Sequence, residues 1–175
     1  MDQNQCLTFQ LAGEEYAVSI LRVKEIITYG PLTTVPHAPP SVKGVINLRG
    51  SVVPVVDLAV KFGRPASPLT NRTCIVILEV DLEGEPTVIG ILTDAVNQVV
   101  ELLDENILPV PAFGTQVRMD FLRGMGKAGA KFVLILEIEK VLAAAVSLNG
   151  ATSAASASAT FVAGESATIA RNENP

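Results

Sequence analysis

Residues 44–58 read GVINLRGSVVPVVDL, the clearest structural signal in the chain. Two apolar runs, residues 45–48 and 52–56, flank Arg49, Gly50 and Ser51. Apolar runs on either side of a short turn predict a β-hairpin. A solvated turn accepts almost any polar residue, whereas arginine also presents a planar fork of donors that suits a carboxylate. The stretch therefore marks Arg49 as a candidate binding residue.

Toward the N-terminus, two alternating stretches at residues 7–11 and 16–20 predict a further hairpin whose turn falls near residues 12–14. From Ser19 the apolar residues recur at helical spacing as far as Ile27. We expect a short helix there, capped by Ser19 and ended by Gly30 and Pro31.

Toward the C-terminus, Pro54 interrupts the second apolar run, which favours an edge strand or a bend at that point. Asp57 is suited to cap a short helix at residues 58–62, and Gly63 is suited to end it. Residues 65–73 are rich in turn formers and give the expected boundary between two subdomains.

Beyond that boundary the sequence predicts further short elements. Strands are expected at residues 74–78, 87–92 and 132–138, with a loop at 81–86 that is longer than a minimal hairpin. Residues 95–102 fit either a strand or a short helix, and we favour the strand. One helical turn is expected at 119–123 and a helix at 139–146. Many short strands with glycine and proline between them predict compact β-barrels rather than a parallel βαβ sheet.

Composition limits the possible partners. The 175 residues carry a net charge of −5 and contain no run rich in lysine and arginine, so neither nucleic acid nor an anionic membrane surface is expected as a partner. No apolar stretch approaches the roughly 18 residues of a membrane span, and we expect a cytoplasmic protein with no direct membrane insertion. The last 29 residues, 147–175, are mostly Ala, Ser and Thr and are expected to form a disordered tail.

Candidate chemistry is sparse. His37 is the only histidine and has no cysteine at a ligand spacing, so a zinc site is poorly supported. Cys74 begins an apolar run, where a thiol is usually packed and unreactive. Residues 124–129, GMGKAG, match a dinucleotide-binding pattern but come before a strand instead of a helix, so we interpret them as a flexible loop. We therefore expect no catalytic residue, no cofactor-binding residue and no metal ligand.

A resemblance to a known family emerges from the quoted hairpin and its surroundings. The stretch GVINLRGSVVPVVDLAVKF, together with GEEYAVSILRVKEI, PHAPPSVKG, VIGILTDAV, ILPVP and FLRGMGK leading to KFVLILEIEKVL, resembles the CheW-like coupling proteins of bacterial chemotaxis. The resemblance covers about Cys6 to Val146. It implies a mainly β fold of two SH3-like five-stranded barrel subdomains with a few short helices, within a CheW-like domain at residues 1–146.

The resemblance also implies a function. A member of this family is a non-enzymatic chemotaxis adaptor, a scaffold that couples the cytoplasmic tips of methyl-accepting chemoreceptors to the regulatory domain of the histidine kinase CheA. It would be recruited to receptor arrays at the membrane. By the same match, the partner-binding residues would be Val23, Glu25, Ile26, Asn47, Leu48 and Arg49.

Other interpretations stay open at this point. Arg49 could instead pair with a carboxylate of the same chain, such as Glu25 or Asp57, without losing a binding role. Ile26 and Leu48 fit core packing as well as partner contact. The alternative function is a regulatory β-barrel that binds a small ligand, with a cryptic hydrolase site at His37 and Cys74.

Overall fold

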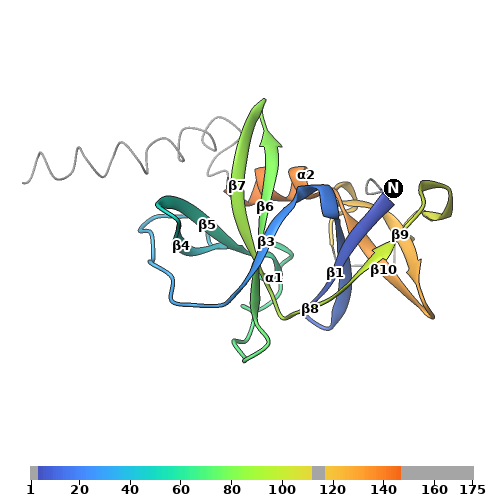
Figure 1. Ribbon diagram of the computed structural model, residues 1–175, viewed down its shortest axis with the longest axis horizontal. Helices are drawn as coiled ribbons and strands as arrows, with labels where there is room; N and C mark the ends of the chain where they lie inside the picture. The colour runs from blue at the N-terminus through green and yellow to red at the C-terminus, as the bar shows by residue number, and fades with distance from the viewer. Residues whose placement is uncertain (1–3, 112–116, 147–175) are drawn as a thin grey trace, which may run out of the picture.

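The computed structural model describes residues 4–111 and 117–146, which form two five-stranded sheets (Figure 1). One sheet, which we call the middle barrel, has the strand order β3-β6-β7-β5-β4 and comes from one continuous stretch of chain. The other, which we call the split barrel, has the order β8-β1-β2-β10-β9 and combines the first two strands with the last three. The mainly β fold with two barrel subdomains is confirmed, whereas the predicted tail, residues 147–175, lies outside the described residues.

The elements have the following bounds. The strands of the split barrel are β1 (Gln5–Leu11), β2 (Glu14–Ser19), β8 (Ala95–Glu101), β9 (Leu122–Ala128) and β10 (Lys131–Leu136). Those of the middle barrel are β3 (Val23–Thr28), β4 (Val42–Leu48), β5 (Ser51–Asp57), β6 (Cys74–Leu82) and β7 (Glu85–Thr93). The helical elements are α1 (Leu58–Lys61), α2 (Ile138–Val146) and the 3-10 turns η2 (Ile20–Arg22), η3 (Asp104–Asn106) and η4 (Met119–Phe121).

The two barrels have the same connectivity. If β3, β4, β5, β6 and β7 are matched with β8, β9, β10, β1 and β2, the two strand orders coincide. The match includes the parallel contact, which joins β5 to β7 in one barrel and β10 to β2 in the other. A short helix follows the matching strands β5 and β10. The split barrel is therefore a permuted copy of the middle barrel, with its β1–β2 hairpin at the start of the chain.

Each barrel is closed by a single bridge to an edge strand. Thr33 bridges to Val45 of β4, and Leu108 bridges to Met125 of β9. The residue before each bridged position is a glycine in close contact with the bridging segment. A Cβ on Gly44 would lie 2.5 Å from the Thr33 carbonyl oxygen, and one on Gly124 would lie 2.9 Å from that of Leu108. Only glycine allows the backbones to approach this closely.

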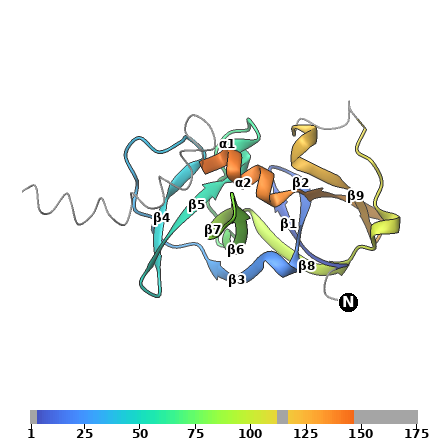
Figure 2. The same cartoon turned by 90° about the horizontal axis from the view of Figure 1, so that it is seen from above.

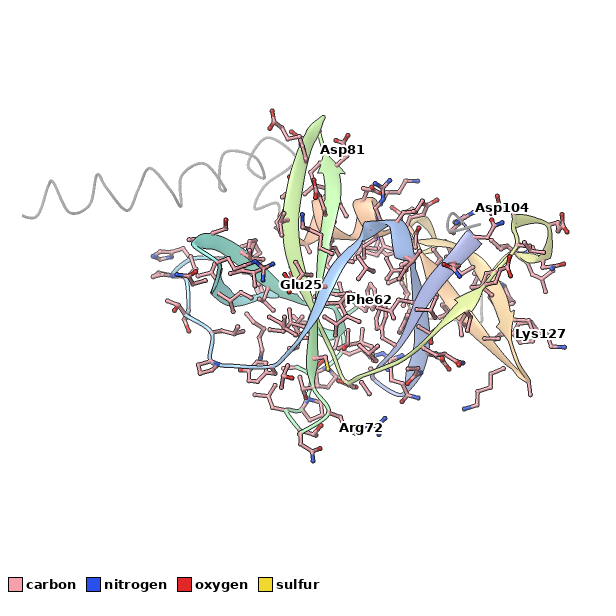
Figure 3. All side chains as sticks on the ribbon, viewed as in Figure 1. Glu25, Phe62, Arg72, Asp81, Asp104 and Lys127 are labelled. Atoms are coloured by element: carbon pink, nitrogen blue, oxygen red, sulfur yellow. The ribbon has the colours of Figure 1, made fainter. Side chains whose placement is uncertain are left out.

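The largest core cluster lies between the barrels and draws side chains from both. The rings of Tyr16 and Phe62 lie 5.6 Å apart, and Phe62 lies 6.3 Å from Phe121. Phe62 occupies the centre of the molecule (Figure 3). Helix α2 runs across this junction (Figure 2), with Val141 and Leu142 fully buried. The two barrels therefore share this largest cluster, and each also has a smaller cluster of its own.

Helix α2 also forms polar contacts with the segments that border β3 and β4. Arg22 of η2 forms an ion pair with Glu139 at 2.9 Å. At the other end of the helix, the Ser41 hydroxyl donates to the Ala145 carbonyl oxygen at 3.2 Å. These contacts fix the approach of both strands to the shared core.

The helix expected from Ser19 to Ile27 is wrong. Ser19 does cap the one-turn helix η2 by accepting a hydrogen bond from the Leu21 N–H, but Val23–Thr28 is the strand β3. Its residues alternate between partly buried and exposed, and it pairs with β6. Pairing with a distant strand has overridden an apolar spacing that a helix also fits.

Pro54 does not lie on an edge strand, because β5 lies between β7 and β4. Val45, which faces Pro54, exchanges both backbone hydrogen bonds with Thr33 on the outer side of β4. Val45 and Pro54 therefore form a non-hydrogen-bonded pair, and the Pro54 nitrogen points away from β4. On that side, β7 pairs with β5 only from Val55 onward. No hydrogen bond is lost at the proline.

Three further expectations differ from the structure. Strands β6 and β7 pair as far as Leu82 and Glu85, so their turn has the minimal length of two residues. The GMGKAG pattern lies mostly in β9 and is not a loop. Residues 65–73 join α1 to β6 within the middle barrel, and the chain changes barrel between β2 and β3 and again between β7 and β8. The remaining strands, the β8 strand among them, are confirmed at their expected places, as are α1, the η4 turn and α2.

Candidate functional site

The six candidate residues lie on the two edge strands of the middle barrel and on the turn next to one of them. Val23, Glu25 and Ile26 belong to β3, and Asn47 and Leu48 belong to the end of β4, followed by Arg49. These strands occupy opposite ends of the strand order. The sheet curls so that Arg49 reaches Glu25, which lies near the β4–β5 hairpin in Figure 3. The structure therefore brings the two predicted groups together.

The turn between β4 and β5 is a tight two-residue turn. Leu48 pairs with Ser51, which leaves Arg49 and Gly50 at the tip. Both have a positive φ, 51° and 89°, as in the type I′ turns that suit the twist of a hairpin. The Asn47 side chain Oδ1 accepts a hydrogen bond from the Gly50 N–H at 2.8 Å. The turn is therefore held by both backbone geometry and a side chain.

Arg49 forms a two-point contact with Glu25. Its Nη2 donates to Oε2 of Glu25, and its Nη1 lies 3.5 Å from Oε1. The Arg49 side chain is 71% exposed, whereas that of Glu25 is 28% exposed. An arginine has five N–H donors, so this contact leaves others available to a second acceptor. The pairing within the chain leaves most of the Arg49 side chain open to solvent.

The electrostatics follow from this contact. The hydrogen bond from Arg49 is the main cause that lowers the pKa of the Glu25 carboxyl. Partial desolvation opposes this effect, while the charges of Arg49 and Lys24 add to it. Glu25 in turn raises the pKa of Arg49. Lys24 itself pairs with Glu79 of β6 at 3.0 Å.

Apolar side chains lie on the same elements as the ion pair. Ile26 of β3 is 43% exposed, and Val52, at the start of β5, is 45% exposed. Val23 and Leu48 are partly buried and pack against core clusters. Ile26 and Leu48 were expected to fit core packing as well as partner contact. Ile26 is open to solvent, whereas Leu48 packs against a core cluster. Val52 was not among the expected contacts, although its place two residues after the turn was a usable signal.

The residues of the alternative hydrolase site lie on different elements. His37 is exposed in the loop before β4, and Cys74 is half-buried at the start of β6. Burial raises the pKa of the other thiol, Cys6. Among residues 4–111 and 117–146, no cluster of three or more His, Cys, Asp or Glu side chains could hold a metal ion. Within the same ranges, no helix is long and apolar enough to cross a membrane.

Comparison with known proteins shows which family this chain resembles. The family model of the CheW-like domain matches residues 5–146. A chemotaxis protein CheW from Klebsiella aerogenes is 37% identical over 136 residues, which are 78% of this chain and 80% of that protein. A probable chemotaxis protein CheW from Rhizobium etli is 35% identical over 136 residues, with 77% and 84% covered.

The fold is also found in a solved structure. The crystal structure of the scaffolding protein TtCheW from Thermoanaerobacter tengcongensis superposes with a TM-score of 0.73 at 29% sequence identity. The match covers 85% of this chain and 90% of that one.

Proposed function

This chain belongs to the CheW-like family of chemotaxis adaptor proteins, and we propose that it couples the cytoplasmic tips of methyl-accepting chemoreceptors to the regulatory domain of the histidine kinase CheA. Its docking surface is formed by β3 and the β4–β5 turn, with Glu25, Ile26 and Arg49 as the principal contacts. The small-ligand alternative is not favoured, because these relatives are named chemotaxis proteins and the solved relative is named a scaffolding protein.

The observation that carries this proposal is the exposed two-point contact between Arg49 and Glu25. An ion pair at the surface contributes little to stability, because water screens it and two long side chains must be ordered. Since the pair adds little to stability, we propose that its role lies in binding. A guanidinium held on a tight turn loses little entropy when a partner carboxylate binds to its remaining donors.

Ile26 and Val52 complement the charged pair. Binding surfaces usually combine apolar contact area with a few oriented polar groups, and arginine is enriched among residues that dominate binding energy. Here Val52 lies on the strand after the turn that carries Arg49, whereas Ile26 follows Glu25 in β3 and points to the opposite face of that strand. The other proposed contacts are Val23 and Leu48, which pack against core clusters, and Asn47, which is exposed.

The remaining features of the proposal concern the whole chain. Residues 1–146 act as the adaptor unit, and residues 147–175 are not required for coupling. The protein acts without catalysis of its own, in the cytoplasm, and is recruited to receptor arrays through its partners. Affinity comes from side-chain contacts with no cofactor.

The test is a pair of titrations of the full chain, one with a receptor signalling fragment and one with the kinase regulatory domain. Arg49→Glu removes the contact and adds like-charge repulsion, so the affinity for the partner that meets this surface should fall by about 30-fold to several-thousand-fold. The affinity of Arg49→Lys should lie between those of the wild type and Arg49→Glu, because an ammonium keeps the charge but lacks the planar fork.

Melting curves serve as the control for these titrations. Arg49→Glu should melt within about 2 °C of the wild type, as expected for a change at an exposed side chain. A variant that binds both partners normally would refute the docking role. A variant that melts far below the wild type would show that the pair is structural.

A further inference from the structure

We propose that Asn47 is a positioning residue for the docking surface: its side-chain oxygen holds the Gly50 N–H and so fixes the turn that brings Arg49 to Glu25. The proposal rests on the docking role of Arg49 and deepens it, because it assigns Asn47 to the orientation of that arginine. Asn47 is exposed, so direct contact with a partner is the competing explanation.

The hydrogen bond acts on a turn with an uncommon backbone, which the turns at Ala12 and Gly13 and at Glu83 and Gly84 also adopt. Arg49 has a φ of 51°, a left-handed conformation that residues other than glycine, asparagine and aspartate adopt only rarely. A turn with this residue at its tip can relax into other conformations, which would redirect the side chain. The 2.8 Å hydrogen bond from Gly50 to Asn47 opposes that relaxation from inside the turn.

The matching hairpin of the split barrel lacks this arrangement. Counting from the paired residues at the turn, Asn47 corresponds to Lys127, and Arg49 corresponds to Gly129. Lysine has no acceptor and cannot hold the amide of the turn in this way. Gly129 has a φ of 66°, whereas Ala130 does not have a positive φ, so this turn is of a different type and has glycine at its left-handed position. The supporting side chain occurs on the hairpin that carries the arginine.

Glu25 provides a reporter within the protein. Its pKa is lowered chiefly by the hydrogen bond from Arg49, so the pKa responds to the position of the guanidinium. If Asn47 positions Arg49, loss of the Asn47 side chain should raise the Glu25 pKa toward the ordinary value of a glutamate. A residue that only touches a partner would leave the Glu25 pKa unchanged in the free protein.

The first experiment measures the Glu25 pKa by NMR titration of its side-chain carboxyl in the full chain. Asn47→Ala should raise this pKa toward the value found in Arg49→Gln, and should speed hydrogen exchange of the Gly50 amide. Lys127→Ala, the same change on the matching hairpin, should alter neither. In Asn47→Asp a carboxylate oxygen takes the place of the amide oxygen that accepts from the Gly50 N–H. Hydrogen exchange of the Gly50 amide should therefore be as slow in Asn47→Asp as in the wild type.

The second experiment compares binding to the receptor signalling fragment and to the kinase regulatory domain. Asn47→Ala should weaken the interaction that Arg49→Glu weakens, by a smaller factor of about 3- to 10-fold. If Arg49→Glu is defective while Asn47→Ala keeps the wild-type Glu25 pKa and Gly50 exchange, the positioning role is refuted and the docking role stands. If Arg49→Glu binds both partners normally, the docking role fails by itself.

Discussion

The β4–β5 hairpin of the middle barrel and the β9–β10 hairpin of the split barrel share one framework but differ at their tips. In each, a glycine lies next to the closing bridge, the turn has two residues and an acidic residue comes before a short helix. The first turn carries Arg49 and Gly50, whereas the second carries Gly129 and Ala130. The framework folds with no arginine at the second turn, so Arg49 is not a requirement of the hairpin.

The neighbouring positions differ in a related way. The residues that follow the turns by two positions, Val52 and Phe132, are both largely exposed, at 45% and 52%. Only the first hairpin reaches an opposite edge strand through an ion pair of its turn residue, within the part of the chain that the structure describes. Lys127 marks the second hairpin at the far end of the molecule from β4 and β5 (Figure 3). The framework that the two hairpins share therefore belongs to the fold, whereas the tip with Arg49 and its ion pair belongs to the proposed docking surface.

The largest effect on stability is expected at Asp57, which caps the helix after β5. Asp57 is fully buried and accepts hydrogen bonds from the Ala59 N–H and from both the N–H and the hydroxyl of Ser67. Asp57→Ala should cost about 3 kcal/mol, because it leaves these buried donors without an acceptor. A melting curve should therefore shift down by about 6 to 12 °C.

Glu137 is the matching residue of the split barrel and is only partly buried. Glu137→Ala should thus cost clearly less than Asp57→Ala in the same melting experiment. Equal losses would show that Glu137 stabilises its barrel as much as Asp57 does, and that the asymmetry between the barrels is smaller than the contacts indicate.

A smaller loss is expected at the closing glycines. A Cβ at Gly44 or Gly124 would lie within 3 Å of a backbone oxygen of the bridging segment. Gly44→Ala and Gly124→Ala should each cost about 1 to 3 kcal/mol as the bridge is forced apart. Gly30→Ala is the matched control, because a Cβ there meets nothing within 4 Å. If either closing glycine behaves like Gly30 in chemical denaturation, the barrels do not close in the same way.

The smallest effect concerns pH. The Glu25 pKa is lower in the folded protein than in the unfolded chain, so its contribution to stability is present above the unfolded pKa and is lost as the pH falls through the folded pKa. The melting temperatures of the wild type and Glu25→Gln should therefore differ slightly at pH 7 and converge in acid. A difference that grows as the pH falls would mean that Arg49 does not stabilise the ionised carboxylate.

The sequence predicted the β4–β5 hairpin and its following helix because their signals are local. The apolar runs, the turn with Gly50 and the cap at Asp57 act within a few residues of one another. The helix expected before Ile27 failed for the opposite reason, since the pairing of β3 with β6 joins residues about 50 positions apart. Local spacing could not decide between the two structures.

The candidate site was predictable in part. The family resemblance supplied the six residues, and Glu25 was one of two carboxylates considered as partners of Arg49. The convergence of β3 and the β4–β5 turn depends on the closure of the middle barrel, which no local pattern reveals. The same limit explains why the permuted arrangement of the split barrel was missed, because its β1–β2 hairpin pairs with β8 and β10, which follow the whole middle barrel in the sequence.

The most direct test of the docking role exchanges the two charges in one variant, Arg49→Glu with Glu25→Arg. The exchange restores an ion pair within the chain but presents the opposite charge at the exposed turn. We expect the double variant to melt like the wild type and to bind as weakly as Arg49→Glu in titrations with the receptor fragment and the kinase regulatory domain. Wild-type affinity in the double variant would contradict this account, because it would show that the pair only shapes the barrel.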